Sequence, residues 1–191
     1  MAPRKVPFYS FRIELRGIRP KIWRYFYVPS NITLARFHRA IQDVMGWMDC
    51  HLYSFTIYGE EYYFSGDGDP NMLLGENSNE ELAKIKLNRL GLSKGSQFLY
   101  LYDMGDSWEH VIKLLDTDYV PKSPGQMYGC FKGARACPPE DCGGVWGYRE
   151  LLENLADPDR GEDEETMEWT GYFDDPEDFD IELINRMLNR P

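Results

Sequence analysis

The chain has 191 residues, of which 42% are hydrophobic and 15% aromatic, and it carries a net charge of −11 at pH 7. No run of 18 apolar residues occurs, so no membrane-spanning helix is expected, and the first residues lack the apolar segment of a secretory signal peptide. We therefore expect a cytoplasmic protein with reduced thiols.

Two strands and a helix are expected at the start of the chain. Residues 8–17 alternate between polar and apolar side chains, which predicts a half-buried strand. After a turn, residues 22–28 are rich in aromatic and β-branched side chains and predict a second strand. Over residues 31–47 the apolar side chains recur at three- and four-residue steps, which predicts a helix that Thr33 can cap.

The middle of the chain is expected to complete the sheet. Residues 65–70 and 90–95 predict turns, and Ile85 with Leu87 marks a further short strand. Residues 103–107 have the length and turn chemistry of a hairpin connection. The remaining strands are expected at 52–58, 61–64, 97–102 and 108–115.

Residues 121–147 predict a loop of defined shape rather than a helix or strand. Pro138 and Pro139 fix φ and lack amide donors, while Gly143 and Gly144 permit positive φ. Loops of this kind commonly carry functional residues.

The C-terminal region, residues 148–191, is expected to be acidic and helical. One helix begins near Tyr148, a partly mobile acidic stretch follows residue 157, and a last helix runs from residues 175–176 to Leu188. Between residues 150 and 182 there are 15 acidic residues and one basic residue, so the rest of the chain carries +3. Either these charges only solvate the surface, or the basic end of the molecule binds an anion or the acidic end binds a basic partner. The overall acidity argues against tight non-specific nucleic-acid binding.

This order of elements predicts a single α+β domain over residues 1–191, with a mostly antiparallel sheet and helices on one face. Residues 1–120 would form the sheet and the first helix, 121–147 the shaped loop, and 148–191 the helical region with two helices. The opening β-β-α-β order is similar to a β-grasp arrangement.

The hairpin carries the first group of candidate site residues. If residues 106–110 are extended, Asp106, Trp108 and His110 project to one face, because successive side chains of a strand alternate. A carboxylate, an indole and an imidazole would then share a polar pocket. The alternative is that Asp103 and Asp106 shape the turn, Trp108 is a core residue and His110 is a hydrogen-bonded sheet residue.

The acidic pair Glu140 and Asp141 follows the two prolines of the loop. These carboxylates either stabilise the N-terminus of the following helix or face Asp106 and His110. In the second case, a carboxylate–imidazole cluster could bind a divalent metal or perform acid–base chemistry.

Three cysteines, Cys130, Cys137 and Cys142, lie in the loop, and Cys50 precedes His51 elsewhere in the chain. Their spacing of six and four intervening residues is not that of a zinc knuckle. A zinc site formed with His110 or His51 is one interpretation, and free, partly buried thiols are the other.

Several stretches of the chain resemble the plasmid pRiA4b ORF-3-like family: residues 102–110, 133–144, 147–148, 173–174, 179–180 and 22–24. The resemblance covers nearly the whole chain and implies no agreed activity. Some relatives travel on plasmids and insertion elements, and a resolvase-like label exists, but the serine nucleophile and arginine cluster of a recombinase cannot be placed on this sequence.

Two functions are therefore predicted as alternatives. The first is a binding or accessory module of a mobile-element-related family, with a protein partner and a polar pocket between residues 103–110 and 133–144. The second is a metal-assisted hydrolase or nuclease that uses zinc or another divalent metal, held by the cluster Asp103, Asp106, His110, Glu140 and Asp141. The candidate pocket residues are Asp103, Asp106, Trp108, His110, Arg135, Glu140 and Asp141.

Overall fold

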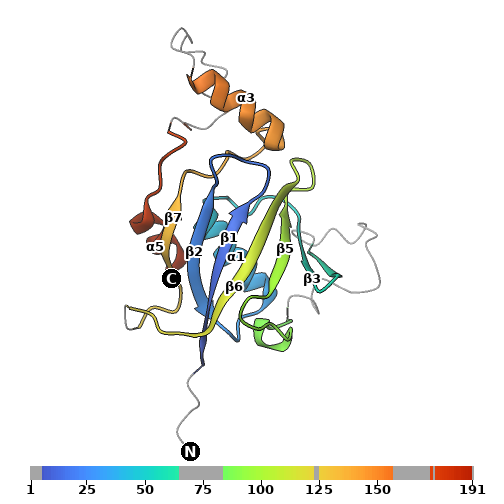
Figure 1. Ribbon diagram of the computed structural model, residues 1–191, viewed down its shortest axis with the longest axis vertical. Helices are drawn as coiled ribbons and strands as arrows, with labels where there is room; N and C mark the ends of the chain where they lie inside the picture. Colours follow the sequence, from blue (N-terminus) through green and yellow to red (C-terminus); the bar gives the residue numbers. More distant parts are fainter. Residues whose placement is uncertain (1–5, 65–83, 123–124, 157–172, 174, 191) are drawn as a thin grey trace, which may run out of the picture.

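The computed structural model describes residues 6–64, 84–122, 125–156, 173 and 175–190, and its centre is one seven-stranded sheet (Figure 1). The turn expected at residues 65–70 and the acidic stretch after residue 157 lie outside these ranges. No helix in the described ranges is long and apolar enough to cross a bilayer.

The strand order is β4-β3-β5-β6-β1-β2-β7, and each pairing of neighbouring strands is antiparallel. The described helices are α1 (Leu34–Met45), α3 (Gly144–Ala156) and α5 (Ile181–Leu188), with a short 3-10 turn η2 (Leu87–Arg89). The expected α+β class with an antiparallel sheet and two helices near the C-terminus is thus confirmed. The strands are β1 (Phe8–Leu15), β2 (Trp23–Pro29), β3 (Tyr53–Ile57), β4 (Glu60–Phe64), β5 (Gln97–Tyr102), β6 (Trp108–Tyr119) and β7 (Gly129–Ala134).

The core lies between the sheet and α1. Phe37 of α1 is completely buried and contacts the rings of four buried phenylalanines, with centroid distances of 4.9 to 6.2 Å. Burying such a side chain contributes about 1.5–3 kcal/mol. The four phenylalanines come from four strands and are Phe11, Phe26, Phe55 and Phe98.

The ends of α1 follow the expected capping chemistry. The Thr33 side chain accepts a hydrogen bond from the Arg36 amide at 3.3 Å, which confirms the cap. Gly46 ends the helix in the left-handed region with φ of 103°, and its amide donates to the Gln42 carbonyl at 2.7 Å.

The expectation that residues 121–147 contain no regular element was wrong. Gly129–Ala134 forms the edge strand β7, which pairs with β2, and α3 already begins at Gly144. The glycines of β7 do not form turns; they leave space for neighbouring aromatic rings. A Cβ at Gly129 would lie 2.5 Å from the ring of Tyr27, and one at Gly133 would lie 2.5 Å from the ring of Phe179.

Two further boundaries differ from the sequence prediction. The short strand expected at Ile85 and Leu87 is a single bridge between Lys86 and Thr33, followed by η2. The last helix begins at Ile181 rather than at the preceding proline, because the Asp180 side chain accepts hydrogen bonds from two amides of the first turn.

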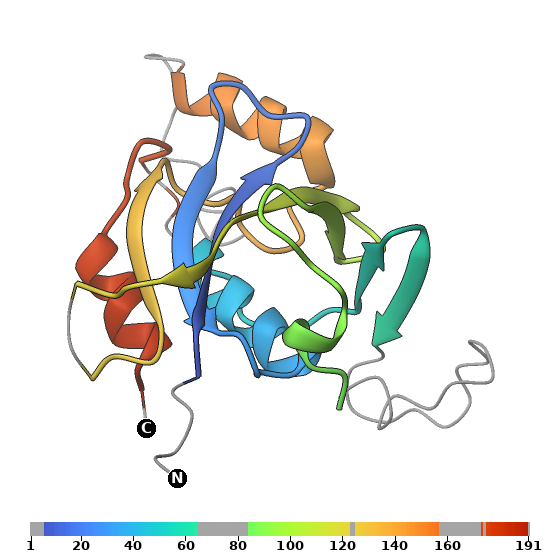
Figure 2. The same cartoon turned by 60° about the horizontal axis from the view of Figure 1, so that its bottom comes forward.

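The helices occupy different places around the sheet (Figures 1 and 2). Helix α1 lies behind the sheet in Figure 1, and α5 contacts both α1 and β7. Helix α3 lies beyond one end of the sheet, where Arg149 donates to the Gly17 carbonyl in the β1–β2 turn at 2.8 Å. The β5–β6 turn lies at the same end, so this end brings together loops that are distant in sequence.

Candidate functional site

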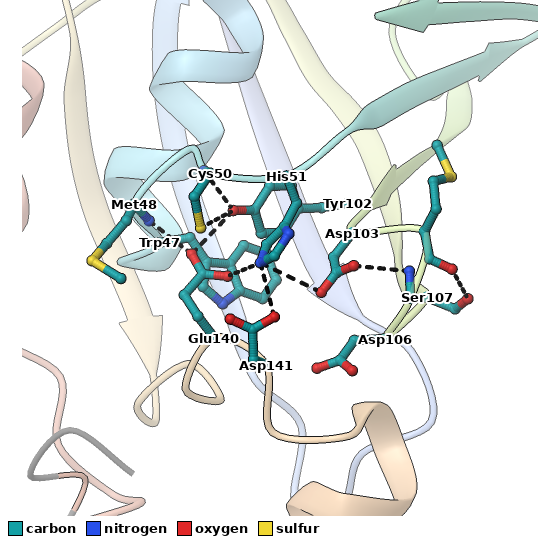
Figure 3. Close-up of polar contacts among 12 residues, drawn as sticks. Trp47, Met48, Cys50, His51, Tyr102, Asp103, Asp106, Ser107, Glu140 and Asp141 are labelled. Atoms are coloured by element: carbon teal, nitrogen blue, oxygen red, sulfur yellow. Dashed lines mark hydrogen bonds and ion pairs between the residues drawn. The ribbon is translucent and has the colours of Figure 1, made fainter. Parts of the chain in front are cut away.

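The β5–β6 turn holds Asp103 in a fixed orientation. Asp103 has φ of 57°, its Oδ1 accepts from the Gly105 amide at 2.8 Å, and its carbonyl accepts from the Ser107 amide at 2.7 Å. Aspartate tolerates the left-handed region better than most residues. One carboxylate oxygen is therefore used to shape the turn, while Oδ2 is left for other partners (Figure 3).

The loop before α3 lies against this turn. The Gly143 amide donates to Asp106 Oδ2 at 3.1 Å. Gly144 has φ of 66°, and a Cβ there would lie 2.5 Å from the Asp106 carbonyl oxygen. Only glycine meets both requirements, so the glycine pair lets the loop and the turn touch.

A third segment, between α1 and β3, closes the site. The Met48 amide donates to Glu140 Oε1 at 2.8 Å, and the Tyr102 hydroxyl donates to the same oxygen at 3.0 Å. The Cys50 amide in turn donates to the Tyr102 hydroxyl at 3.2 Å. These bonds fix Glu140 with its second oxygen, Oε2, turned towards His51 (Figure 3).

His51 is the centre of the resulting cluster. Its Nε2 lies 3.2 Å from Asp141 Oδ1, 3.7 Å from Asp103 Oδ2 and 3.7 Å from Glu140 Oε2. Nε2 of His51 and Oε2 of Glu140 are both buried atoms that have no hydrogen-bond partner among the described residues. One imidazole nitrogen thus lies within ion-pair range of three carboxylate oxygens, but it makes a well-aligned hydrogen bond to none of them.

These donor atoms have the composition of a divalent metal site. The ligand atoms of His51, Asp103 and Asp141 lie within 4.8 Å of one another, and so do those of Cys50, His51 and Glu140. Imidazole nitrogen, carboxylate oxygen and thiolate sulfur are the ligands that Zn²⁺ and related transition metals take. Glu140 is 10% exposed and Asp141 is 70% exposed, so one side of the cluster opens to solvent.

The surroundings keep the polar groups next to the cluster uncharged. Burial, with the nearby Glu140 charge, raises the pKa of Tyr102, which therefore remains a neutral hydroxyl donor. Burial also raises the pKa of the Cys50 thiol, and the Glu140 and Asp141 charges act in the same direction. A bound cation would reverse this effect, because a coordinating thiol is deprotonated.

Asp103, Glu140 and Asp141 from the predicted pocket converge, whereas Trp108 and His110 do not join them. Both are 0% exposed, because the side of β6 that they share faces the core. Asp106 does not continue that strand, since β6 starts only at Trp108 and Ser107, with φ of 56°, interrupts the extended geometry expected over 106–110. His110 contacts the Tyr100 carbonyl through Nδ1 at 3.3 Å, and burial lowers its pKa to about 3.

Asp106 and Arg135 have structural contacts instead. Asp106 accepts from the Gly143 amide, as described above. Arg135 is buried and has φ of 68°. Its Nε donates to Glu177 at 2.6 Å and its Nη1 to the Pro20 carbonyl at 2.9 Å, so it ties the C-terminal segment to the β1–β2 turn.

Among the described residues, the three loop cysteines share no potential metal-ligand group with His51 or His110. All four cysteines are free, and the potential ligand groups of the described residues contain none of Cys130, Cys137 and Cys142. Burial raises the pKa of Cys130 to about 11 and that of Cys142 to about 12, so these thiols are neutral and poor ligands as they stand.

The sequence indicates His51 only as an optional ligand in a zinc site with those cysteines. The available signal was its position in the short connection between α1 and β3, which also carries Asp49 and Cys50. Nothing in the periodicity of the chain indicates that this connection meets residues 103 and 140.

A family model described as plasmid pRiA4b ORF-3-like protein matches residues 7–184. The uncharacterized protein y4hQ of Sinorhizobium fredii is 36% identical over 163 residues, which cover 85% of this chain and 80% of that protein. The crystal structure of MM3350, a protein of unknown function from Methanosarcina mazei, is 38% identical, with a TM-score of 0.73 and coverage of 92% of this chain and 96% of that one.

Proposed function

The chain belongs to the plasmid pRiA4b ORF-3-like family, and we propose that it is a metal-dependent binding module whose divalent cation is held by His51, Asp103, Glu140 and Asp141. Its relatives y4hQ and MM3350 are described as uncharacterized and of unknown function. The proposal therefore rests on the chemistry of the site.

The observation that carries the proposal is the pair of buried atoms without partners. Leaving a buried polar atom without a hydrogen bond costs about 1–3 kcal/mol. His51 Nε2 and Glu140 Oε2 are two such atoms, 3.7 Å apart and aimed at each other. A cation between them would satisfy both and would offset the repulsion among the three carboxylates.

The hydrogen bonds around the carboxylates support the same proposal. Ligating carboxylates in metal sites are themselves hydrogen-bonded, which orients the oxygen that binds the metal. Glu140 Oε1 accepts from Met48 and Tyr102, and Asp103 Oδ1 accepts from Gly105, while the other oxygen of each carboxylate faces His51. Each carboxylate is thus held in place by one oxygen with the other left to coordinate.

Metal-assisted hydrolysis is the second candidate, and the exposure of Asp141 favours it. Catalytic metal sites keep an open coordination position, whereas structural sites are closed by protein ligands. With Asp141 70% exposed at the solvent side, a bound cation could accept a water or a substrate oxygen there.

As further parts of the proposal, the module is cytoplasmic, has a protein partner and is accessory to a mobile element.

Calorimetric titration of metal-free protein with Zn²⁺ and with Mn²⁺ tests the metal site. We expect one ion per chain, with affinity reduced at least 10-fold in His51→Ala and in Glu140→Gln. Cys142→Ser is the matched control, since it removes a buried thiol that lies outside the cluster. The absence of binding heat, or equal affinity in all four proteins, would contradict the proposal.

A substrate panel separates the two candidates. Metal-loaded protein would be incubated with phosphodiester, phosphomonoester, ester and peptide substrates. Two results together would favour the hydrolase. The metal-free wild type would gain hydrolysis when metal is added, and metal-loaded His51→Ala would show none. Metal binding without turnover would favour the binding module.

A further inference from the structure

The face of the sheet opposite α1 carries a row of aromatic rings. Helix α1 lies behind the sheet in Figure 1, and the described helices leave the front face of β1, β2, β6 and β7 uncovered (Figures 1 and 2). Tyr25 and Phe131 stack with centroids 5.9 Å apart, and Phe131 and Tyr119 stack at 5.3 Å. Trp23 continues the row, 5.0 Å from Tyr25.

Part of this row is open to solvent. Phe131 is 40% exposed, while Trp23, Tyr25 and Tyr119 are half-buried. Phe131 already stacks on two rings of the row, so the row offers another flat group the exposed parts of its rings that no neighbouring ring covers. The row lies on strands rather than on loops, so its spacing is fixed by the sheet.

Cations accompany the rings. The Arg12 guanidinium lies 5.9 Å and the Lys132 ammonium 5.7 Å from the centre of the Trp23 ring. Arg12 also pairs with Glu14, whereas Lys132 has no ion pair within the described part of the chain. Positive charge therefore lies beside the rings at the end of β2 nearest the β1–β2 turn.

A basic hollow of about 500 Å³ continues the face at that turn. Its walls carry four cations and one carboxylate, although the molecule as a whole has a net charge of −11. Two of the cations are in ion pairs, Lys21 with Glu14 and Arg16 with Glu109. Arg19 is exposed and has no ion pair among the described residues, while Arg149 lies 5.2 Å from the ring of the exposed Trp146. The charged residues of the hollow are Glu14, Arg16, Arg19, Lys21 and Arg149.

We propose that this face binds single-stranded nucleic acid, with phosphates in the basic hollow and bases against the aromatic row. A basic groove that follows the backbone, next to aromatic side chains that stack on bases, is how proteins bind single strands without sequence preference. A duplex keeps its bases stacked inside, so the faces of the bases are not available to the rings. With a net charge of −11, the molecule binds a duplex weakly, and the aromatic row makes the single strand the preferred ligand.

Fluorescence anisotropy with a labelled 12-nucleotide oligothymidine, and with a 12-base-pair duplex as comparison, tests the proposal. EDTA is present throughout, so the result is independent of the metal cluster. At 50 mM salt we expect binding of the single strand and at least 10-fold weaker binding of the duplex. Three or four phosphate contacts would weaken single-strand binding about 20- to 50-fold between 50 and 200 mM salt.

Matched variants locate the binding surface. Arg19→Glu should lower affinity and flatten the salt dependence, and Phe131→Ala should lower affinity roughly 5-fold or more with the salt dependence retained. Arg36→Glu, on the exposed side of α1, and Tyr63→Ala, on the distant strand β4, should bind like the wild type. Circular dichroism of each variant is the control for correct folding.

Three results would overturn the proposal: no single-strand binding at 50 mM salt, a duplex bound as tightly as the single strand, or an effect of Arg36→Glu equal to that of Arg19→Glu. His51→Ala should bind the oligonucleotide normally. A failure of this proposal would therefore leave the metal site untouched, and the reverse is also true.

Discussion

Replacing Asp141 by asparagine should have opposite effects on the metal-free and the metal-bound protein. The change removes one negative charge and keeps the shape of the side chain. Asparagine also tolerates the φ of 54° at this position. The ligand oxygens of Asp103 and Asp141 lie within 4.8 Å of each other, so in the metal-free protein they repel.

The size of both effects follows from this geometry. Two charges about 5 Å apart interact by ~1 kcal/mol in water and by ~3 kcal/mol at an effective dielectric constant of 20. Because Asp141 is 70% exposed, we expect the lower value, which is a gain of ~1 kcal/mol for the metal-free variant. At 100 times Kd, a metal stabilises the wild type by about 2.7 kcal/mol, and a 10- to 100-fold loss of affinity would reduce this to about 0.4–1.4 kcal/mol.

Thermal unfolding of the metal-free and the Zn²⁺-loaded proteins measures both numbers. For a chain of this size 1 kcal/mol corresponds to about 2–4 °C in Tm. The metal-free variant should therefore melt about 2–4 °C above the wild type, and Zn²⁺ should raise its Tm less than it raises that of the wild type. A variant that melts lower without metal and responds fully to Zn²⁺ would refute the reasoning.

Three further substitutions test the structure around the site. Arg24 is buried and donates to four backbone carbonyls, so Arg24→Met should cost about 2–6 kcal/mol in urea unfolding, and a loss below 1 kcal/mol would contradict this. Burial lowers the pKa of His110 from 6.5 to about 3, so the unfolded chain takes up a proton first and stability falls by ~1.4 kcal/mol per pH unit below pH 6.5. Between pH 7 and pH 5 the free energy of unfolding in urea should therefore fall by about 2 kcal/mol less in His110→Phe than in the wild type. An equal fall in both proteins would contradict the assignment to His110. Gly144→Ala places a Cβ 2.5 Å from the Asp106 carbonyl oxygen at φ of 66°, so it should cost about 1–3 kcal/mol and weaken Zn²⁺ binding in calorimetry, whereas unchanged binding would separate the loop from the site.

The fold was largely predictable because its signals are local. The alternation along β1 and the three- and four-residue steps of α1 depend on neighbouring residues, and Phe11, Ile13 and Phe37 are buried as those patterns require. β7 was missed because Gly129 and Gly133 have the composition of a loop, although their role is to leave space for Tyr27 and Phe179.

The candidate site was only partly predictable because it depends on contacts between distant segments. Asp103, Glu140 and Asp141 stood out by their place in turns and beside prolines. His51 joins them through space from a third segment, and no local pattern reports such a meeting. His110 was chosen on strand alternation, which correctly placed it beside Trp108 but could not say that their common side is the core.

The most direct test of the metal site is a crystal structure of the protein with Zn²⁺, with anomalous diffraction data collected at the zinc absorption edge. The site predicts one strong anomalous peak about 2.0–2.1 Å from His51 Nε2, with carboxylate oxygens of the cluster at about 2.0–2.2 Å. A zinc peak at the loop cysteines instead, or no peak beside His51 at millimolar Zn²⁺, would contradict it.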